Sequence, residues 1–185
     1  MSKLTIAVIS GSSRSKRQSH QVAQLVQNKL NDHDQGIDAW MLDVKELNLP
    51  LLDTTYGSNN SPTEQLSDLA GQLENSDAFI IVSPEWNGTF PGGLKNTLDY
   101  FLPQYKKKAF GIIGVSSGML GGINAAKNLV TYVQHLKGII SPTLLITPNV
   151  EKIFENEKLT DMAYDRRLNS FIDELLWLAN ALNQK

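Results

Sequence analysis

The sequence predicts an α/β domain in which a five-stranded parallel sheet is covered by helices on both sides. Two observations predict this class. Apolar runs alternate five times with segments of helical periodicity, and the apolar runs lack the polar alternation of a strand with one exposed face. A chain of 185 residues suits one core, so we expect a single domain over residues 1–185.

Each predicted strand is a short, mostly apolar run that ends at polar or turn-forming residues. In chain order, these runs are Leu4–Ile9, Ile37–Val44, Ala78–Val82, Ala109–Val115 and Ile139–Ile146. The first run ends abruptly at Ser10 and Gly11, and the third ends just before Pro84, which cannot continue a sheet ladder.

Helices are predicted after these strands from apolar residues at helical spacing. The apolar stripes are Val22, Leu25, Val26 and Leu30; Leu66, Leu69, Ala70 and Leu73; Leu94, Leu98 and Phe101; Ile123–Leu136; and Phe171, Ile172, Leu175, Leu176 and Leu182. The second helix has a start signal, with Ser61 as N-cap, Pro62 at the first helical position and Glu64 as the capping-box acid. Residues 45–60 are expected to form a loop.

Right-handed crossovers between parallel strands place helices on both faces of the sheet. With five strands, we predict the flavodoxin-like order 2-1-3-4-5 in a three-layer α/β/α sandwich. Such sheets bind ligands at the carboxyl ends of the strands, where the order reverses between strands one and three. The candidate functional loops are therefore residues 10–19, 83–93 and 116–122.

Composition excludes several classes of function. The chain has 17 Lys and Arg against 19 Asp and Glu, which disfavours nucleic acid as the main partner. It has no cysteine, so redox chemistry must come from a bound cofactor. We find neither a signal-peptide pattern nor an apolar run of membrane-spanning length, and expect a soluble, cytoplasmic protein without a membrane partner. The three histidines lack metal-ligand spacing, so no metal site is predicted.

The loop after the first strand has the residue types of a phosphate site. Serine hydroxyls, three basic residues (Arg14, Lys16 and Arg17) and the N–H groups of the next helix can all contact an anion there. With a single glycine, the loop matches neither GxGxxG nor GxxxxGK[ST], so a phosphate monoester such as that of FMN fits better than a dinucleotide. The alternative is a polar, basic surface loop that begins a helix.

The loop after the third strand has the features of a flavin rim. Because Pro84 ends the sheet ladder, the peptide groups of Glu85, Trp86, Asn87 and Gly88 are free to face a ligand. A flavin ring needs amides along its edge and an aromatic or backbone surface over its faces. The alternative is that Trp86 is a core or subunit-interface aromatic.

The loop after the fourth strand resembles a hydrolase motif, since residues 114–118 match GxSxG after a strand and before a helix. However, no acid lies between Ser117 and His135, the only downstream histidine, so the required order of acid and base is missing. We interpret Ser116, Ser117 and Gly118 as a loop that approaches the flavin edge, with a plain glycine-rich turn as the alternative.

Three motifs together resemble the NADPH-dependent FMN reductase family of flavodoxin-like proteins, which includes chromate, quinone and azo-dye reductases. They are SGSxR after the first strand, PEWNGTFPGGLKNTLDY after the third, where Trp86 replaces the family's Tyr, and SSGMLGG after the fourth. The resemblance covers nearly the whole chain. It implies noncovalently bound FMN, NADPH or NADH as hydride donor, and a homodimer or homotetramer.

Residue by residue, the resemblance implies three contacts with FMN. Ser12, Arg14, Ser19 and His20 would hold the phosphate, Pro84 to Asn87 the ring edge, and Ser116 to Gly118 the opposite side. His20 stands near the position of a family Asn, and the spacing between Arg14 and Ser19 is longer than in the family.

The expected function is an FMN-dependent NAD(P)H oxidoreductase that passes hydride to the flavin and then, by a ping-pong mechanism, to a small-molecule quinone, azo, flavin or metal-oxyanion acceptor. No side chain is predicted to be catalytic, because the flavin carries the chemistry. Two alternatives stay open, a noncatalytic flavodoxin-type electron carrier and an FMN-free interaction protein on the same fold. Lys106–Lys108 could contact the 2′-phosphate of NADPH or be solvated surface, and Asp43 could bind a ribose.

Overall fold

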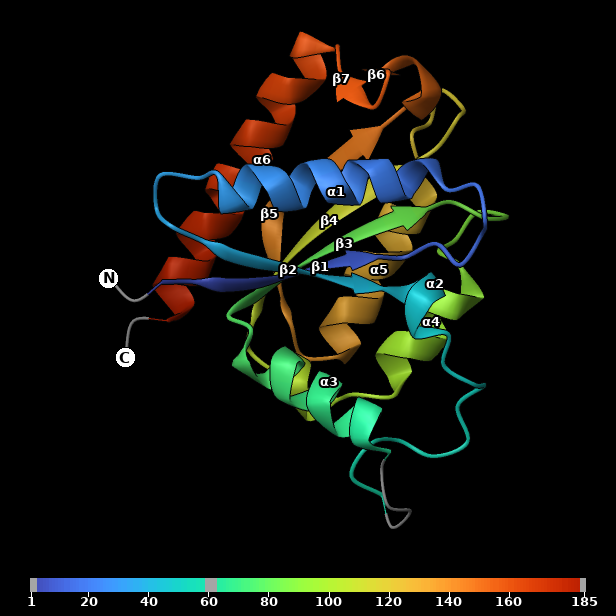
Figure 1. Ribbon diagram of the computed structural model, residues 1–185, viewed down its shortest axis with the longest axis vertical. Helices are drawn as coiled ribbons and strands as arrows, with labels where there is room; N and C mark the ends of the chain where they lie inside the picture. The colour runs from blue at the N-terminus through green and yellow to red at the C-terminus, as the bar shows by residue number, and fades with distance from the viewer. Residues whose placement is uncertain (1–2, 59–62, 184–185) are drawn as a thin grey trace.

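The computed structural model describes residues 3–58 and 63–183 and shows a five-stranded parallel sheet in the order β2-β1-β3-β4-β5 (Figure 1). The strands are β1 (Thr5–Ser10), β2 (Asp38–Asp43), β3 (Ala78–Pro84), β4 (Ala109–Val115) and β5 (Ile139–Thr147). All five predicted strands and their order are confirmed, but β3 runs through Pro84, which pairs with Val115, instead of ending before it. A small antiparallel pair, β6 (Phe154–Glu155) and β7 (Lys158–Leu159), follows β5.

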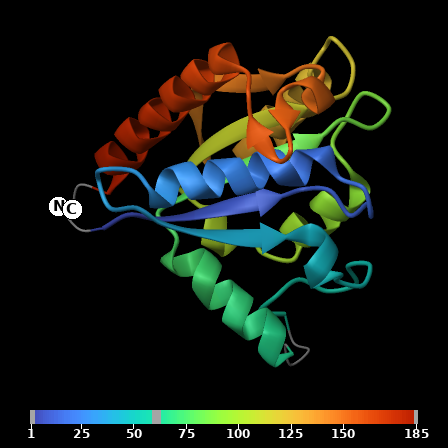
Figure 2. The same ribbon diagram turned by 45° about the horizontal axis from the view of Figure 1, so that its top comes forward.

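Helices cover both faces of the sheet, as Figures 1 and 2 show. The helices are α1 (Gln18–Asn31), α2 (Val44–Leu47), α3 (Glu64–Asn75), α4 (Gly92–Asp99), α5 (Ile123–His135) and α6 (Met162–Leu182), with single 3-10 turns η1 (Pro103–Tyr105) and η2 (Val150–Lys152). One core joins the sheet to α1 and α6, and a second joins it to α3, α4 and α5. The three-layer sandwich is thereby confirmed.

Strand β3 explains why the apolar runs lacked polar alternation. Ile80 and Val82 point into the core with α1 and α6, whereas Phe79 and Ile81 point into the core with α3, α4 and α5, and all four are fully buried. Burial of each such side chain contributes roughly 1.5–3 kcal/mol relative to exposure. A strand with two buried faces must therefore be apolar at every position.

One predicted loop differs from the structure, and one predicted helix start lies outside the described residues. Residues 45–47, predicted to lie in a loop, form α2 together with Val44, because the Asp43 carboxylate accepts a hydrogen bond from the Lys45 N–H at 3.0 Å and so starts a helix. Ser61 and Pro62, the predicted start of the next helix, lie outside the described residues. As described, α3 begins at Glu64 with Thr63 as its N-cap.

Parallel strands bring their carboxyl ends to one edge of the sheet, at the right of Figure 1. The loops that follow β1, β3 and β4 meet at this edge, on both sides of the point where the strand order reverses. Over the described ranges, none of the helices combines the length and apolar character needed to cross a membrane.

Candidate functional site

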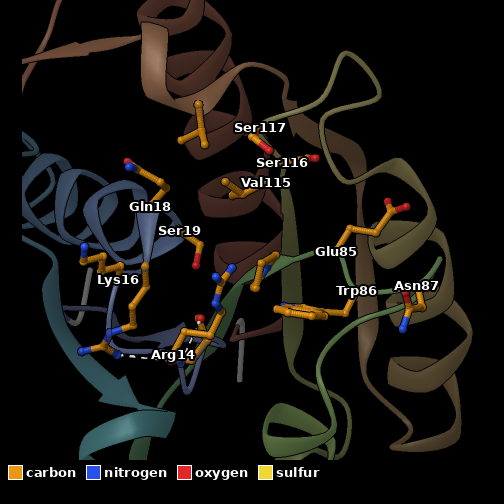
Figure 3. A pocket seen from close by; sticks show the side chains of 14 residues that line it. Arg14, Lys16, Gln18, Ser19, Glu85, Trp86, Asn87, Val115, Ser116 and Ser117 are labelled. Carbon is orange, nitrogen blue, oxygen red and sulfur yellow. Dashed lines mark hydrogen bonds between the residues drawn. The ribbon is translucent and has the colours of Figure 1, made fainter.

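A cavity of about 370 Å³, here the first cavity, opens at the carboxyl ends of β1, β3 and β4 (Figure 3). It is lined by Ser12, Arg14, Lys16, Arg17, Gln18, Ser19, Pro84, Glu85, Trp86, Asn87, Val115, Ser116, Ser117 and Val150. The structure thus brings the three candidate loops together around one space. Of the predicted cofactor-binding residues, His20, Gly88 and Gly118 are not part of its lining.

Helix α1 begins at the first cavity, and no side chain of the described residues caps its first turn. Its N-cap residue, Arg17, provides no side-chain cap, and its first turn has no acidic residue. Ser19 is only 2% exposed, yet its hydroxyl has no hydrogen-bond partner within the described part of the chain. Free N–H groups, the positive end of the helix dipole and an unpartnered buried hydroxyl together form a site suited to an anion.

Arg17 braces the loop that precedes α1. Its guanidinium forms an ion pair with Asp43 and donates to the Ser12 carbonyl at 3.3 Å. Burial alone would raise the pKa of the Asp43 carboxyl, but hydrogen bonds from Arg17 and the Lys45 N–H outweigh it, and the pKa is lowered. Asp43, a possible ribose ligand from the sequence, is therefore engaged with Arg17 and α2.

His20 lies behind this loop instead of facing the first cavity. Its Nδ1 is 3.0 Å from the Ser10 Oγ and 3.4 Å from the Asp43 Oδ2. Burial, helped by the charge of Arg17, lowers the pKa of His20. Adjacent residues on a helix point about 100° apart. When Ser19 faces the first cavity, His20 is therefore turned toward β1 and β2.

Arg14 is the charged side chain at the centre of the first cavity. Its guanidinium carbon lies 5.1 Å from the centroid of the Trp86 ring, which is 43% exposed. In Figure 3 this guanidinium lies between Ser19 and Trp86. In residues 3–58 and 63–183, neither Arg14 nor Lys16 has an acidic group within 4.0 Å, so both charges are uncompensated.

Trp86 is presented by a tight hairpin. The Trp86 N–H donates to the Thr89 carbonyl at 2.8 Å, and the Thr89 N–H donates back at 3.0 Å. Asn87 and Gly88 between them have φ values of 46° and 80°, the left-handed pair of a two-residue turn. Gly88 is therefore at the tip, where its carbonyl accepts from the Asn128 side chain at 2.9 Å instead of facing the first cavity.

The Glu85 side chain caps α5. Its carboxylate accepts hydrogen bonds from the Asn124 N–H at 3.0 Å, the Asn124 side-chain amide at 3.0 Å and the Ala125 N–H at 3.4 Å. The N-cap position of α5 is Gly122, which has no side chain to do this. Figure 3 shows the Glu85 carboxylate directed away from Arg14, so Glu85 offers the first cavity mainly its backbone.

The loop after β4 is held by its own hydroxyl and by the chain that follows β5. The Ser116 Oγ accepts from the Gly118 N–H at 3.0 Å, and the Ser116 N–H donates to the Thr147 carbonyl at 3.1 Å. The Val150 N–H donates to the Ser116 carbonyl at 3.1 Å. Gly118 is consequently part of a local turn, whereas Ser116 and Ser117 line the first cavity.

The glycine pair of this loop is required for packing against the sheet. Gly121 and Gly122 have φ values of 59° and 84°. A Cβ on Gly121 would lie 2.7 Å from the Pro148 nitrogen, and one on Gly122 would collide with the Val115 nitrogen. Both positions therefore need glycine for left-handed backbone and close approach within the chain.

Sequence reasoning missed three lining residues, Gln18, Val115 and Val150. Gln18 adjoins Ser19 at the start of α1 and could have been found from that position. Val115 ends β4, directly before the candidate loop. Val150 follows β5, and no motif in the sequence marked that turn.

Lys108 has a structural contact at the opposite edge of the sheet. Its Nζ donates to the carbonyls of Leu73 at 2.8 Å and Glu74 at 2.7 Å, at the end of α3. Burial lowers the pKa of Lys108 to about 8. Lys108 precedes β4, whereas the first cavity lies at the carboxyl ends of the strands, so this lysine caps a helix far from the site. Across the described ranges, no group of three or more His, Asp and Glu side chains could hold a metal ion.

Comparison with known sequences gives one family. The sequence profile of NADPH-dependent FMN reductase matches residues 4–152. The chain is 27% identical over 179 residues to the FMN-dependent NADPH-azoreductase of Staphylococcus saprophyticus, covering 91% of this chain and 92% of the relative. It is 28% identical over 180 residues to the enzyme of the same name from Staphylococcus aureus, covering 94% of each chain.

Comparison with solved structures gives the same fold. FerB, a flavoenzyme NAD(P)H:(acceptor) oxidoreductase from Paracoccus denitrificans, aligns with a TM-score of 0.76 and 25% identity, covering 96% of this chain and 98% of FerB. A flavodoxin from Pseudomonas aeruginosa aligns with a TM-score of 0.61 and 16% identity, covering 95% of this chain and 99% of the flavodoxin. The predicted flavodoxin-like fold is therefore confirmed.

Proposed function

Because the chain belongs to the NADPH-dependent FMN reductase family, we propose that its first cavity binds FMN and that the protein reduces a small-molecule acceptor with hydride from NADPH or NADH. The observation that carries this proposal is the anion site at the start of α1, which opens into a cavity at the switch point of the sheet. When bound, FMN would supply the chemistry, since it would accept hydride from the nicotinamide and pass the two electrons to the acceptor.

The phosphate end of the first cavity fits a phosphate monoester. Ser19 offers a buried hydroxyl without another partner, Ser12 a second buried hydroxyl, and α1 its free N–H groups. Arg14 and Lys16 supply uncompensated positive charge that would neutralise most of a phosphate, which carries about −1.5 to −2 at pH 7. This match in donors and in charge supports FMN over uncharged riboflavin.

The ring end of the first cavity would orient the flavin without acid-base side chains. Pro84 to Asn87 offer backbone groups, Val115 and Val150 apolar surface, and Ser117 a hydroxyl. The only carboxylate in the lining, that of Glu85, is used by α5. We therefore propose that the backbone N–H groups of Asn87 and Ser117, which have no partner among the described residues, and no ionised side chain, stabilise negative charge that develops at the ring edge.

We propose ping-pong turnover with acceptors that enter after the nicotinamide product leaves. The azoreductase names of the relatives support azo compounds as one class of acceptor, and quinones, free flavins and metal oxyanions are further classes that one exposed ring face would admit.

We also propose a homodimer or homotetramer. Met119 and Leu120, 87% and 67% exposed at the rim of the site, support it, since adjoining exposed apolar side chains mark interfaces.

Stopped-flow mixing of FMN-loaded protein with NADPH under argon tests the proposed function. We expect prompt bleaching of the flavin absorbance and recovery of the absorbance when a quinone or azo dye is added. Ping-pong turnover would give parallel double-reciprocal plots at several acceptor concentrations. Bound flavin that keeps its absorbance with both NADPH and NADH would contradict the reductase and favour an electron carrier.

A further inference from the structure

A second cavity of about 400 Å³ shares a wall with the first. Ser12, Arg14, Trp86 and Asn87 line both cavities. The other walls of the second cavity are formed by Ser13, by Thr89 to Pro91 and by the start of α4. Arg14 is the only charged residue among all those that line it, and Trp86 and Phe90 are aromatic. Without the guanidinium, this would be an uncharged pocket with aromatic walls.

Arg14 is the charged side chain in the wall that the two cavities share. Among the described residues, the Arg14 guanidinium has no hydrogen bond or ion pair, and it lies 5.1 Å from the centroid of the Trp86 ring. A cation over an exposed aromatic ring is weakly held. Guanidinium–phosphate hydrogen bonds are charge-assisted and often bidentate, and they are among the strongest in proteins. A phosphate at the start of α1 would therefore bind the Arg14 guanidinium more strongly than the Trp86 ring does and would draw it off the ring.

We propose that the second cavity binds a flat aromatic electron acceptor, with the Trp86 indole as its stacking surface, and that phosphate bound in the first cavity opens it by drawing Arg14 off the ring. An aromatic wall without charge favours a flat, apolar ring system. This inference rests on the proposed function for the identity of the phosphate ligand and of the acceptor.

The two cavities would then be thermodynamically coupled. If phosphate uncovers the indole, it raises the affinity of the second cavity for an aromatic ring. By linkage, a bound ring must raise the affinity for phosphate by the same factor. Arg14 is the only side chain that this coupling requires, whereas Lys16 lines the first cavity alone and affects only phosphate affinity.

Fluorine NMR of protein labelled with 5-fluorotryptophan tests the first step without any turnover. The chain has three tryptophans, so Trp86 can be assigned from three resonances by a Trp86→Phe variant. Glycerol 3-phosphate is the probe, because it is a phosphate monoester without a ring. We expect saturating probe to shift the Trp86 resonance and leave those of Trp40 and Trp177 in place. In Arg14→Gln the Trp86 resonance should not respond, and in the matched variant Lys16→Gln it should respond at a higher probe concentration.

The second step is tested on FMN-loaded protein in the oxidised state, with 2-methyl-1,4-naphthoquinone as the ring probe. The absence of cysteine excludes thiol adducts. Quinone affinity, followed through the Trp86 resonance, should fall about fivefold or more in Phe90→Leu, as expected from loss of an aromatic contact. FMN affinity should be unchanged in this variant, since Phe90 does not line the first cavity.

The outcomes separate this inference from the proposed function. FMN binding with a Trp86 resonance that ignores glycerol 3-phosphate would overturn the Arg14 movement and leave the proposed function intact. Quinone binding that is equally tight in wild type and Phe90→Leu would overturn the second cavity as its site. If the wild-type protein binds neither FMN nor glycerol 3-phosphate, the proposed function fails, and the inference fails with it.

Discussion

Helices α1 and α5 both begin at the carboxyl edge of the sheet, and their first turns are satisfied in opposite ways. At α5, the carboxylate of Glu85 accepts three hydrogen bonds from Asn124 and Ala125. At α1, no side chain caps the helix, and the buried hydroxyl of Ser19 has no partner within the described ranges. Positive dipole ends attract anions equally. Of these two helix starts, α1 is therefore the one at which a ligand anion is expected, because the protein supplies a carboxylate at α5 and none at α1.

The same contrast holds for the loops before the two helices. The loops after β3 and β4 are joined to each other and to the chain after β5 through Glu85, Asn128, Ser116 and Val150. In the loop after β1, Arg17 is braced by Asp43, but Arg14 and Lys16 extend without acidic partners among the described residues. The loops after β3 and β4 therefore fix the shape of the site, whereas the side chains of the loop after β1 are left to bind a ligand.

The largest expected effect comes from Ser19→Ala at the open helix start. Loss of a hydroxyl donor to a charged phosphate should weaken FMN binding roughly 10- to 100-fold. The free energy of unfolding of the FMN-free protein should not decrease, because the deleted hydroxyl is buried without a partner. Flavin fluorescence titration and urea unfolding measure the two quantities. A loss of stability without a loss of affinity would reverse the assignment of α1 as the ligand end.

Glu85→Gln tests the closed helix start and should have the opposite signature. Replacing the capping carboxylate should lower the free energy of unfolding by about 1 kcal/mol, in the range of helix caps and charge–dipole contacts. FMN affinity should change less than about threefold, which corresponds to roughly 0.65 kcal/mol. Urea unfolding of Glu85→Gln beside Glu46→Gln, an exposed acid near the other helix start, provides the control. A stability equal to wild type would mean that the cap contributes nothing.

The smallest effect concerns His20 behind α1. Burial and Arg17 lower its pKa, so the unfolded chain binds more protons than the folded one at pH values just below 6.5. The contribution of His20 to stability should therefore fall as the pH drops through this window. His20→Asn should remove that part of the slope in the free energy of unfolding between pH 7 and pH 5. Its FMN affinity should stay close to wild type, whereas a large loss would place His20 on the phosphate.

The sequence was sufficient for the five strands of the main sheet and for the five longer helices, because each carries a local signal, either a continuous apolar run or an apolar stripe at helical spacing. Buried runs such as Ala78–Val82 and the stripe through Leu175 and Leu176 specify two cores without reference to distant residues. The short helix α2 was missed because it depends on one local contact of Asp43 within a segment rich in turn residues.

The site was predictable at the level of loops and less so at the level of side chains. Motifs identified the three loops that form the first cavity. They did not show that Glu85 would turn to cap α5 or that His20 would face Ser10, since both depend on residues distant in the sequence or on helix phase. Val150 entered the site through a backbone contact with Ser116, which no residue type signals.

If the open start of α1 holds the phosphate of FMN, the wild-type protein must distinguish FMN from riboflavin, which differ only in that phosphate. A side-by-side titration with the two flavins measures this difference. With charge-assisted contacts from α1, Ser19, Arg14 and Lys16, FMN should bind at least about 100-fold more tightly than riboflavin, and added inorganic phosphate should weaken FMN binding but not riboflavin binding. Equal affinities for the two flavins, unaffected by inorganic phosphate, would mean that the start of α1 does not hold the phosphate of FMN.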